Sequence, residues 1–250
     1  MFVRAINALR RAARWRVAWI QRDYEQRSDS RRYSYESRIL NQAYAPWATD
    51  ANFNEVYRLA RANTLVDVAR CYELWDLLHG LSEVPGAVVE VGVWRGGTGA
   101  ILARALMRTK PREKVYLCDT FAGVVKAGSR DKIYRGGEHA DTSVEDVEEL
   151  LKKLRLTNAV LLKGMFPEET ASQIPAGPIA LCHIDVDVYQ SAKDTVSWVT
   201  ERLSPGGALV FDDYGFPSCV GVTSYVDELK AKAGWHFIYN LNGHAILIKR

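Results

Sequence analysis

The sequence lacks any long uninterrupted apolar run. Although 48% of its 250 residues are hydrophobic, no stretch approaches the ~20 apolar residues that a membrane span requires. Residues 1–20 are interrupted by five arginines and therefore lack the apolar segment of a signal peptide. Gly and Pro are too few, and the hydrophobic share too high, for a fibrous or disordered chain. These absences predict one sizeable globular core.

Cysteine is also scarce, and the four cysteines are scattered. They are Cys71, Cys118, Cys182 and Cys219, with no C-x-x-C pair among them. A zinc knuckle and a thioredoxin-type redox site are therefore disfavoured. This usage is typical of a reducing compartment, and we expect a cytoplasmic protein.

Charge is nearly balanced overall but unevenly distributed. The net charge is +3, yet residues 1–38 hold ten Arg and four acids, and the remainder carries −3. The body therefore has no general nucleic-acid footprint. Apolar residues recur at helical spacing over residues 1–22, which predicts an Arg-rich amphipathic helix. Such a helix can pack on the body or on a partner subunit of a homo-oligomer, or lie on an anionic membrane surface.

From Val84 onward, short apolar strands alternate with helices. Strands are expected over 87–92, 114–119, 159–164, 178–185, 208–214, 235–240 and 244–250, and helices over 55–80, 98–108, 143–155, 186–203 and 218–233. Thr98 is expected to cap the second helix, and Ser143 or Thr142 the third. Strand–helix alternation predicts parallel strands with right-handed crossovers. The last two strands form a hairpin around residues 241–243, which predicts a reversed edge strand.

The predicted fold class is α/β. It is a doubly wound, mostly parallel seven-stranded sheet with helices on both faces and an antiparallel C-terminal hairpin, in the Rossmann-like manner. Residues 55–250 would form this domain, and residues 1–54 an N-terminal extension with the basic helix and covering segments.

Acidic residues follow the predicted strands where ligands of such sheets bind. Because the carboxyl ends of parallel strands meet at one edge, six carboxylates are expected in one crevice. Close carboxylates repel one another, so a cation or protons must compensate them. The six residues are Glu90, Asp119, Asp185, Asp187, Asp212 and Asp213.

The first strand leads into a glycine-rich turn with a nucleoside-site pattern. Gly92, Gly96 and Gly97 would let the backbone approach a ligand closely, and Asp119 stands where an acid binds ribose hydroxyls. The turn reads E-x-G-x-x-x-G-G instead of G-x-G-x-x-G. This spacing disfavours NAD and favours a ligand without a pyrophosphate, such as S-adenosylmethionine. The alternative is a tight turn with a surface aspartate.

Three of the aspartates offer a set of hard oxygen ligands. Asp185, Asp212 and Asp213 suit Mg²⁺, or Mn²⁺, with water completing the coordination. Side chains alternate along a strand, so Asp212 and Asp213 share a direction only if the strand ends there; otherwise Asp213 caps a helix or faces solvent. Asp187 lies one alternation beyond Asp185 and is either a further ligand or an unligated base.

At these positions the sequence resembles a known family. The segments EVGVWRGGTGA (90–100), CDTFAG (118–123), HIDVDVYQS (183–191) and LSPGGALVFDDYG (203–215) resemble the macrocin O-methyltransferase family, with its mycinamicin and noviose sugar methyltransferases. The resemblance covers about residues 55–250. It implies a class I methyltransferase that uses S-adenosylmethionine and Mg²⁺ to methylate a sugar hydroxyl on a glycosylated small molecule or glycan.

The resemblance also implies residue roles. The metal falls to Asp185, Asp212 and Asp213, and the general base to Asp187. The cofactor residues would be Glu90, Gly92, Val93, Trp94, Thr98, Asp119, Thr120, Ser143 and Asp185. The chain has Cys182-His183 where the family usually has Arg, and its loop at 120–125 differs too. Because substrate-covering segments lie there and in residues 1–54, the acceptor stays open.

Further residues and functions compete with this interpretation. His139, His183 and Tyr189 could touch substrate, although a solvated loop residue or a packed core residue explains each of them as well. Arg95 could bridge to a carboxylate. A catechol or phenolic O-methyltransferase would use the same metal chemistry, and an NAD oxidoreductase is disfavoured by the turn. An inactive binding or assembly protein would leave the strand-end acids uncompensated.

Overall fold

The computed structural model describes residues 44–240 and 242–250. Residues 45–250 form one compact unit. The helix predicted over residues 1–22 and most of the covering segment lie outside the described residues, and the domain boundary at residue 54 stays a prediction. Within the described ranges, no helix is both long enough and apolar enough to cross a membrane.

A single seven-stranded sheet organises the unit, and this confirms the predicted fold class. The strands are β1 (Ala87–Val91), β2 (Val115–Asp119), β3 (Ala159–Lys163), β4 (Ile179–Ile184), β5 (Leu203–Phe211), β6 (Trp235–Tyr239) and β7 (Ala245–Lys249). Their order is β3-β2-β1-β4-β5-β7-β6. The first five strands of this order run parallel.

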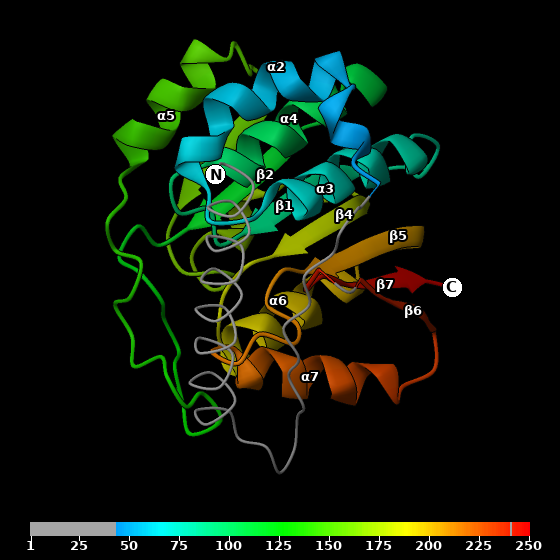
Figure 1. Ribbon diagram of the computed structural model, residues 1–250. Coiled ribbons are helices and arrows are strands. Elements are labelled where there is room, and N and C mark those ends of the chain that lie inside the picture. Colours follow the sequence, from blue (N-terminus) through cyan, green and yellow to red (C-terminus); the bar gives the residue numbers. More distant parts are fainter. Residues whose placement is uncertain (1–43, 241) are drawn as a thin grey trace, which may run out of the picture. The chain divides into compact units, whose positions relative to one another are not determined.

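The winding direction of the sheet reverses between β1 and β4. The chain steps outward from β1 to β3, returns to β4 beside β1, and then steps outward to β5 on the other side. Ligands of doubly wound sheets bind at such a reversal, beyond the carboxyl ends of the strands. The site is therefore expected just after β1 and β4 (Figure 1).

The C-terminal hairpin corrects one expectation. β7 pairs antiparallel with both β5 and β6, so the reversed strand is interior and β6 is the edge. The prediction that the reversed strand lies at the edge is wrong, and the reason is the burial of apolar side chains. Ala245, Ile246 and Leu247 of β7 are buried, whereas Ile238 and Tyr239 of β6 are about half exposed, so the more apolar strand takes the covered place.

Helices cover both faces of the sheet (Figure 1). One face carries α2 (Ala51–Ala60), α3 (Val68–Gly80), α4 (Gly97–Thr109) and α5 (Val144–Lys153), and the other carries α6 (Tyr189–Thr200) and α7 (Val220–Lys230). Short 3₁₀ turns occupy Pro46–Ala48 (η1), Arg61–Asn63 (η2) and Ala171–Gln173 (η3). Neighbouring residues of β1 serve opposite cores: Val88 packs with α3 and α4, and Val89 with α6 and α7, as strand alternation requires.

The ends of α4, β5 and α6 differ from expectation, whereas the cap of α5 is one of the two expected residues. Gly96, with a φ of 82°, is the N-cap of α4, so Thr98 lies inside the first turn and is not the cap. β5 begins at Leu203 rather than at 208, and α6 therefore ends earlier than predicted. Ser143 is the cap of α5, since its side chain accepts a hydrogen bond from the Asp146 backbone N–H at 3.1 Å.

Candidate functional site

A cavity of about 290 Å³ opens beyond the carboxyl ends of β1, β2, β4 and β5. Most of the residues expected at the site line it: Gly92, Val93, Trp94, Thr98, Asp119, Thr120, His139, Asp185, Asp187, Asp212 and Asp213. Four expected residues are not among its lining residues: Glu90, Ser143, His183 and Tyr189. The folded chain thus gathers five of the six strand-end acids around one space.

The turn after β1 is held by Asp119. Its Oδ2 accepts hydrogen bonds from the backbone N–H of Val93 at 2.7 Å and of Trp94 at 2.9 Å. Its Oδ1 accepts one from the Phe121 N–H at 2.7 Å. A carboxylate that accepts several backbone N–H groups fixes a loop firmly. Asp119 therefore shapes the turn of the expected nucleoside site, and it also lines the cavity.

Backbone packing within the protein itself requires glycine at position 92. Its φ is +88°, and a Cβ added there would lie 1.6 Å from the Asp185 carbonyl oxygen. The glycine is needed so that the end of β1 can pass beside the end of β4. The contacts thus explain this glycine by strand packing, whereas the expected reason was close approach of a ligand to the backbone.

Side-chain contacts also join this turn to Asp141, in the segment before α5. Arg95 forms an ion pair with Asp141 at 2.6 Å, and its guanidinium lies 4.6 Å from the centre of the Trp94 ring. The Trp94 indole N–H also donates to Asp141 at 2.9 Å. The expected bridge from Arg95 to a carboxylate is confirmed.

The carboxylates of Asp185, Asp212 and Asp213 converge at the ends of β4 and β5. One oxygen from each lies within 4.8 Å of the others. β5 ends at Phe211, so the two adjacent aspartates are in a turn and escape strand alternation. Burial, followed by neighbouring carboxylates, raises the pKa of Asp185 and of Asp213 well above the usual range. This hard-oxygen set, in which Asp212 and Asp213 are buried and Asp185 is partly buried, fits a divalent cation, which would relieve the repulsion.

Asp212 differs from the other two because cationic and imidazole partners surround it. The Arg70 guanidinium bonds its Oδ2, and His244 Nε2 lies 2.9 Å from its Oδ1. Burial alone would raise the pKa of Asp212, but His183, His244 and the Arg70 charge together lower it. Arg70 and His244 were missed from the sequence, since only folding brings positions so distant in the chain together.

Asp187 reaches the same space through a turn of its own. Its φ is +64°, and its backbone N–H donates to Asp213 Oδ2 at 2.8 Å. The Tyr134 hydroxyl hydrogen-bonds its carboxylate, and the Cys219 thiol lies 3.6 Å from Oδ1. Burial raises the pKa of Asp187. Asp187 shares the crevice with Asp185, as expected, but it does so through the turn and not through strand alternation.

The loop over residues 121–141 is tied to the body at several points. Lys126 pairs with Glu168 at 2.6 Å and Asp194 at 2.8 Å. The buried Asp131 carboxylate accepts a hydrogen bond from the Tyr189 backbone N–H at 2.9 Å. These anchors carry Tyr134 and His139 into the cavity wall.

The sequence missed Tyr134, together with Phe216 and Cys219, which also line the cavity. The available signal for Tyr134 was its position as an aromatic residue in the glycine-rich loop over residues 121–141. No spacing rule connects it with Asp187, so the pattern alone could not assign it.

Two expected site residues serve the core instead. Glu90 is fully buried, and its Oε1 lies 2.9 Å from His183 Nδ1, so this carboxylate stands behind the turn rather than facing the cavity. His183 is also fully buried. Burial alone would lower the pKa of His183, but the Asp212 and Glu90 carboxylates raise it to about 10.

The other two, Tyr189 and Ser143, have structural partners as well. The Tyr189 hydroxyl donates to Glu228 at 2.9 Å, and Ser143 caps α5. The contacts at Tyr189 follow from its position as the first residue of α6, where it packs against Tyr225 of α7.

Comparison with known proteins decides the family. The family model described as macrocin O-methyltransferase (TylF) matches residues 34–237. The chain belongs to this family. The matched range includes the glycine-rich turn after β1, the loop over residues 121–141 and the aspartates at the ends of β4 and β5. The resemblance seen in the motifs is therefore confirmed.

Two relatives illustrate the likeness. The 8-demethyl-8-(2,3-dimethoxy-alpha-L-rhamnosyl)-tetracenomycin-C 4'-O-methyltransferase of Streptomyces olivaceus is 33% identical over 171 residues, which cover 63% of this chain and 65% of that protein. The mycinamicin III 3''-O-methyltransferase of Micromonospora griseorubida is 30% identical over 63% of this chain and 67% of its own length. The match to the first relative spans less than two thirds of it.

A solved structure agrees. The O-methyltransferase NovP superposes with a TM-score of 0.67 at 25% identity, covering 78% of this chain and 88% of NovP. Calicheamicin methyltransferase, at 18% identity and a TM-score of 0.63, shares the fold.

Proposed function

We propose that this protein is an S-adenosylmethionine- and Mg²⁺-dependent O-methyltransferase that acts on a sugar hydroxyl of a glycosylated natural product or glycan. One observation carries the proposal: Asp185, Asp212 and Asp213 converge beside Asp187 in the same cavity that the Gly92–Trp94 turn lines. Family membership supports the reaction class.

The residues present fit both implied groups. The converging carboxylates of Asp185, Asp212 and Asp213 supply hard oxygen donors, the ligands that Mg²⁺ prefers. The turn held by Asp119 offers the position and the acceptor for a ribose. When bound, the cofactor supplies the methyl group, and Mg²⁺ would acidify a hydroxyl that it coordinates.

The chain's own groups divide the remaining work. Asp187 accepts the proton of the acceptor hydroxyl, and Tyr134 orients its carboxylate by a hydrogen bond. Arg70 and His244 keep Asp212 ionised and in place. Phe216 and Val125 form part of the apolar wall of the cavity.

The acceptor is inferred from the relatives. The two relatives described above carry the names of a 4'-O-methyltransferase of a dimethoxy-rhamnosyl-tetracenomycin and of a 3''-O-methyltransferase of mycinamicin III. A vicinal diol on a sugar could chelate a cation held by the three aspartates. Homo-oligomer formation, contact with a membrane through residues 1–22 and a cytoplasmic location stay predictions beside this proposal.

Calorimetric titration with S-adenosylhomocysteine, with NAD as the control ligand, tests the cofactor. We expect binding of the former alone. A panel of deoxysugar glycosides and catechols, assayed with S-adenosylmethionine and Mg²⁺, then tests the acceptor. Methylation of catechols only would replace the sugar assignment. NAD binding, or no binding by folded protein, would contradict the methyltransferase proposal.

Substitution Asp119→Ala should weaken S-adenosylhomocysteine binding by about 10- to 100-fold. It removes the proposed acceptor of a ribose hydroxyl, and one hydrogen bond to a charged group contributes about 1.5–3 kcal/mol. It also releases the three backbone N–H groups that shape the turn. Calorimetry measures the affinity. Asp76→Ala, at an exposed position of α3, is the matched control and should bind as the parent protein does. Equal affinity in Asp119→Ala would remove this residue from the cofactor site.

Saturating Mg²⁺ should raise the melting temperature. Binding to the folded state alone adds about 2.7 kcal/mol of stability at a concentration of 100 Kd, and relief of the Asp185–Asp213 repulsion is the physical source. Differential scanning fluorimetry measures the shift, with KCl at equal ionic strength as the control. Asp213→Asn should abolish most of it; an unchanged shift in this variant would place the ion elsewhere.

A further inference from the structure

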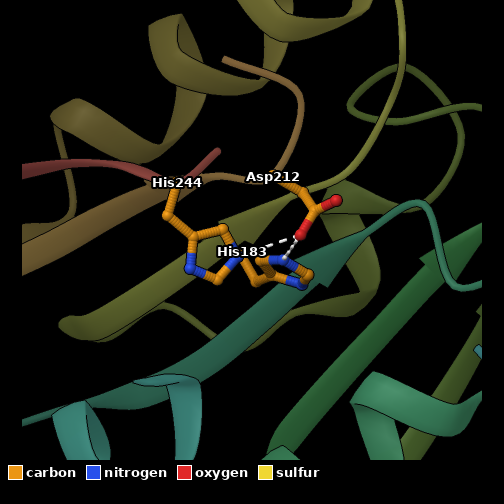
Figure 2. Close-up of side chains that lie close together, drawn as sticks. All are labelled: His183, Asp212 and His244. Carbon is orange, nitrogen blue, oxygen red and sulfur yellow. Dashed lines mark hydrogen bonds and ion pairs between the residues drawn. The ribbon is translucent and has the colours of Figure 1, made fainter. Parts of the chain in front are cut away.

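Behind the three aspartates, two buried histidines face one oxygen of Asp212 (Figure 2). His244 Nε2 lies 2.9 Å and His183 Nε2 3.8 Å from Asp212 Oδ1. Both rings are fully buried. The three atoms lie within 4.8 Å of one another. Asp212 thus belongs to two clusters, one with oxygen donors only and one with imidazoles.

Each imidazole has a carboxylate on its outer nitrogen. His183 Nδ1 lies 2.9 Å from Glu90 Oε1, and His244 Nδ1 lies 2.5 Å from Glu73 Oε2. A carboxylate in this position accepts a hydrogen bond from Nδ1–H, which leaves Nε2 as the nitrogen where an ion could replace a proton. The same pairing orients the histidine ligands of metal ions in proteins.

The inner nitrogen of His183 has no hydrogen-bond partner, although it is fully buried. Its distance of 3.8 Å from Asp212 Oδ1 is too long for a hydrogen bond. Two ligands that each lie about 2.0–2.2 Å from one ion have a separation of up to about 4 Å. The gap between His183 and Asp212 therefore has the size of a shared cation.

The charges around the histidines are unbalanced. Glu90, Asp212 and Glu73 supply three carboxylates, and Arg70 is the one fixed cation that the described residues place on them. Counted with both imidazoles neutral, two negative charges remain. Either a divalent cation or two extra protons on the imidazoles would compensate them.

We propose that His183, His244 and Asp212 form a second metal site, suited to a transition-metal ion of the Zn²⁺ type. Imidazole with one carboxylate is a ligand set for Zn²⁺ and its neighbours, whereas Mg²⁺ prefers oxygen ligands throughout. An ion at the histidines would hold Asp212 through Oδ1, whereas Arg70 bonds Oδ2. The site shares Asp212 with the proposed Mg²⁺ ligands but does not require methyltransferase activity.

The test is a Co²⁺ titration of the full-length, chelator-stripped protein in excess Mg²⁺, with Zn²⁺ as competitor. Co²⁺ reports its own coordination through visible absorption. We expect about one equivalent to bind, with bands of nitrogen ligation that Zn²⁺ displaces. His244→Gln should abolish the bands, and Glu73→Gln should weaken binding by about 10- to 100-fold. His236→Gln, at an exposed position of β6, is the matched control and should bind as the parent protein does.

Three results would overturn the proposal. The first is no Co²⁺ or Zn²⁺ binding in excess Mg²⁺ by protein that still binds S-adenosylhomocysteine. The second is equal binding by His244→Gln and the parent protein. The third is ¹⁵N NMR showing both imidazoles doubly protonated and unchanged by Zn²⁺, since two protons would then fill the cluster. If His244→Gln does not fold, Glu73→Gln, whose side chain is partly exposed, decides between the same outcomes.

Discussion

Asp187→Asn should lower turnover by about 10²- to 10⁴-fold, the range that positioned proton transfer contributes. The amide keeps the size of the side chain and removes the proton acceptor. The affinity for S-adenosylhomocysteine should stay within a factor of about two, because Asp187 stands on the aspartate side of the cavity and not on the turn that Asp119 holds. Initial rates at saturating cofactor and Mg²⁺ measure the effect.

Two controls separate loss of the base from damage to the site. Asp76→Asn, at an exposed position of α3, should retain parent turnover. The Mg²⁺-dependent rise in melting temperature should persist in Asp187→Asn, since the ligand set of Asp185, Asp212 and Asp213 is left intact. Parent-level turnover in Asp187→Asn would exclude it as the base, and loss of the Mg²⁺ shift would make it a ligand.

Gly92→Ala should destabilise the protein by several kcal/mol, of the order of 3–5. The new Cβ would meet the Asp185 carbonyl at 1.6 Å in a backbone conformation with φ of +88°, so the backbone of β1 or β4 must move. At roughly 2–4 °C per kcal/mol for a chain of this size, the melting temperature should fall by about 10 °C.

The matched control for this substitution is Gly80→Ala. An added Cβ there meets no atom within 4 Å, and residue 80 is the last of α3. It should change stability by less than about 1 kcal/mol. Similar melting temperatures for the two variants would show that β1 and β4 can separate without cost at their ends.

The spacing of the sequence motifs alone predicts many of the residues of this site. The cavity is lined by four residues of the turn, by Asp119 and by the aspartates at the ends of β4 and β5; the four turn residues are Gly92, Val93, Trp94 and Thr98. Parallel strands force this result, because their carboxyl ends meet at one edge of the sheet. A local sequence pattern is sufficient to locate a residue when the fold class fixes where the end of each strand lies.

Side-chain partners could not be derived in the same way. Glu90 looked like a cofactor residue, since it precedes the turn, but strand alternation directs it into the core against His183. Arg70, Glu73 and His244 come from α3 and the hairpin and meet Asp212 only after folding. Their chain separations carry no periodic signal.

The fold class, the strand-end position of the acids and the family resemblance follow from the amino-acid sequence alone, because hydrophobic periodicity and glycine spacing are local properties of the chain. Three features emerge only on folding: β7 lies inside the sheet, Tyr134 meets Asp187, and Asp212 joins a buried imidazole cluster. These contacts depend on which segments pack across the sheet, and packing between distant segments is a property of the whole fold.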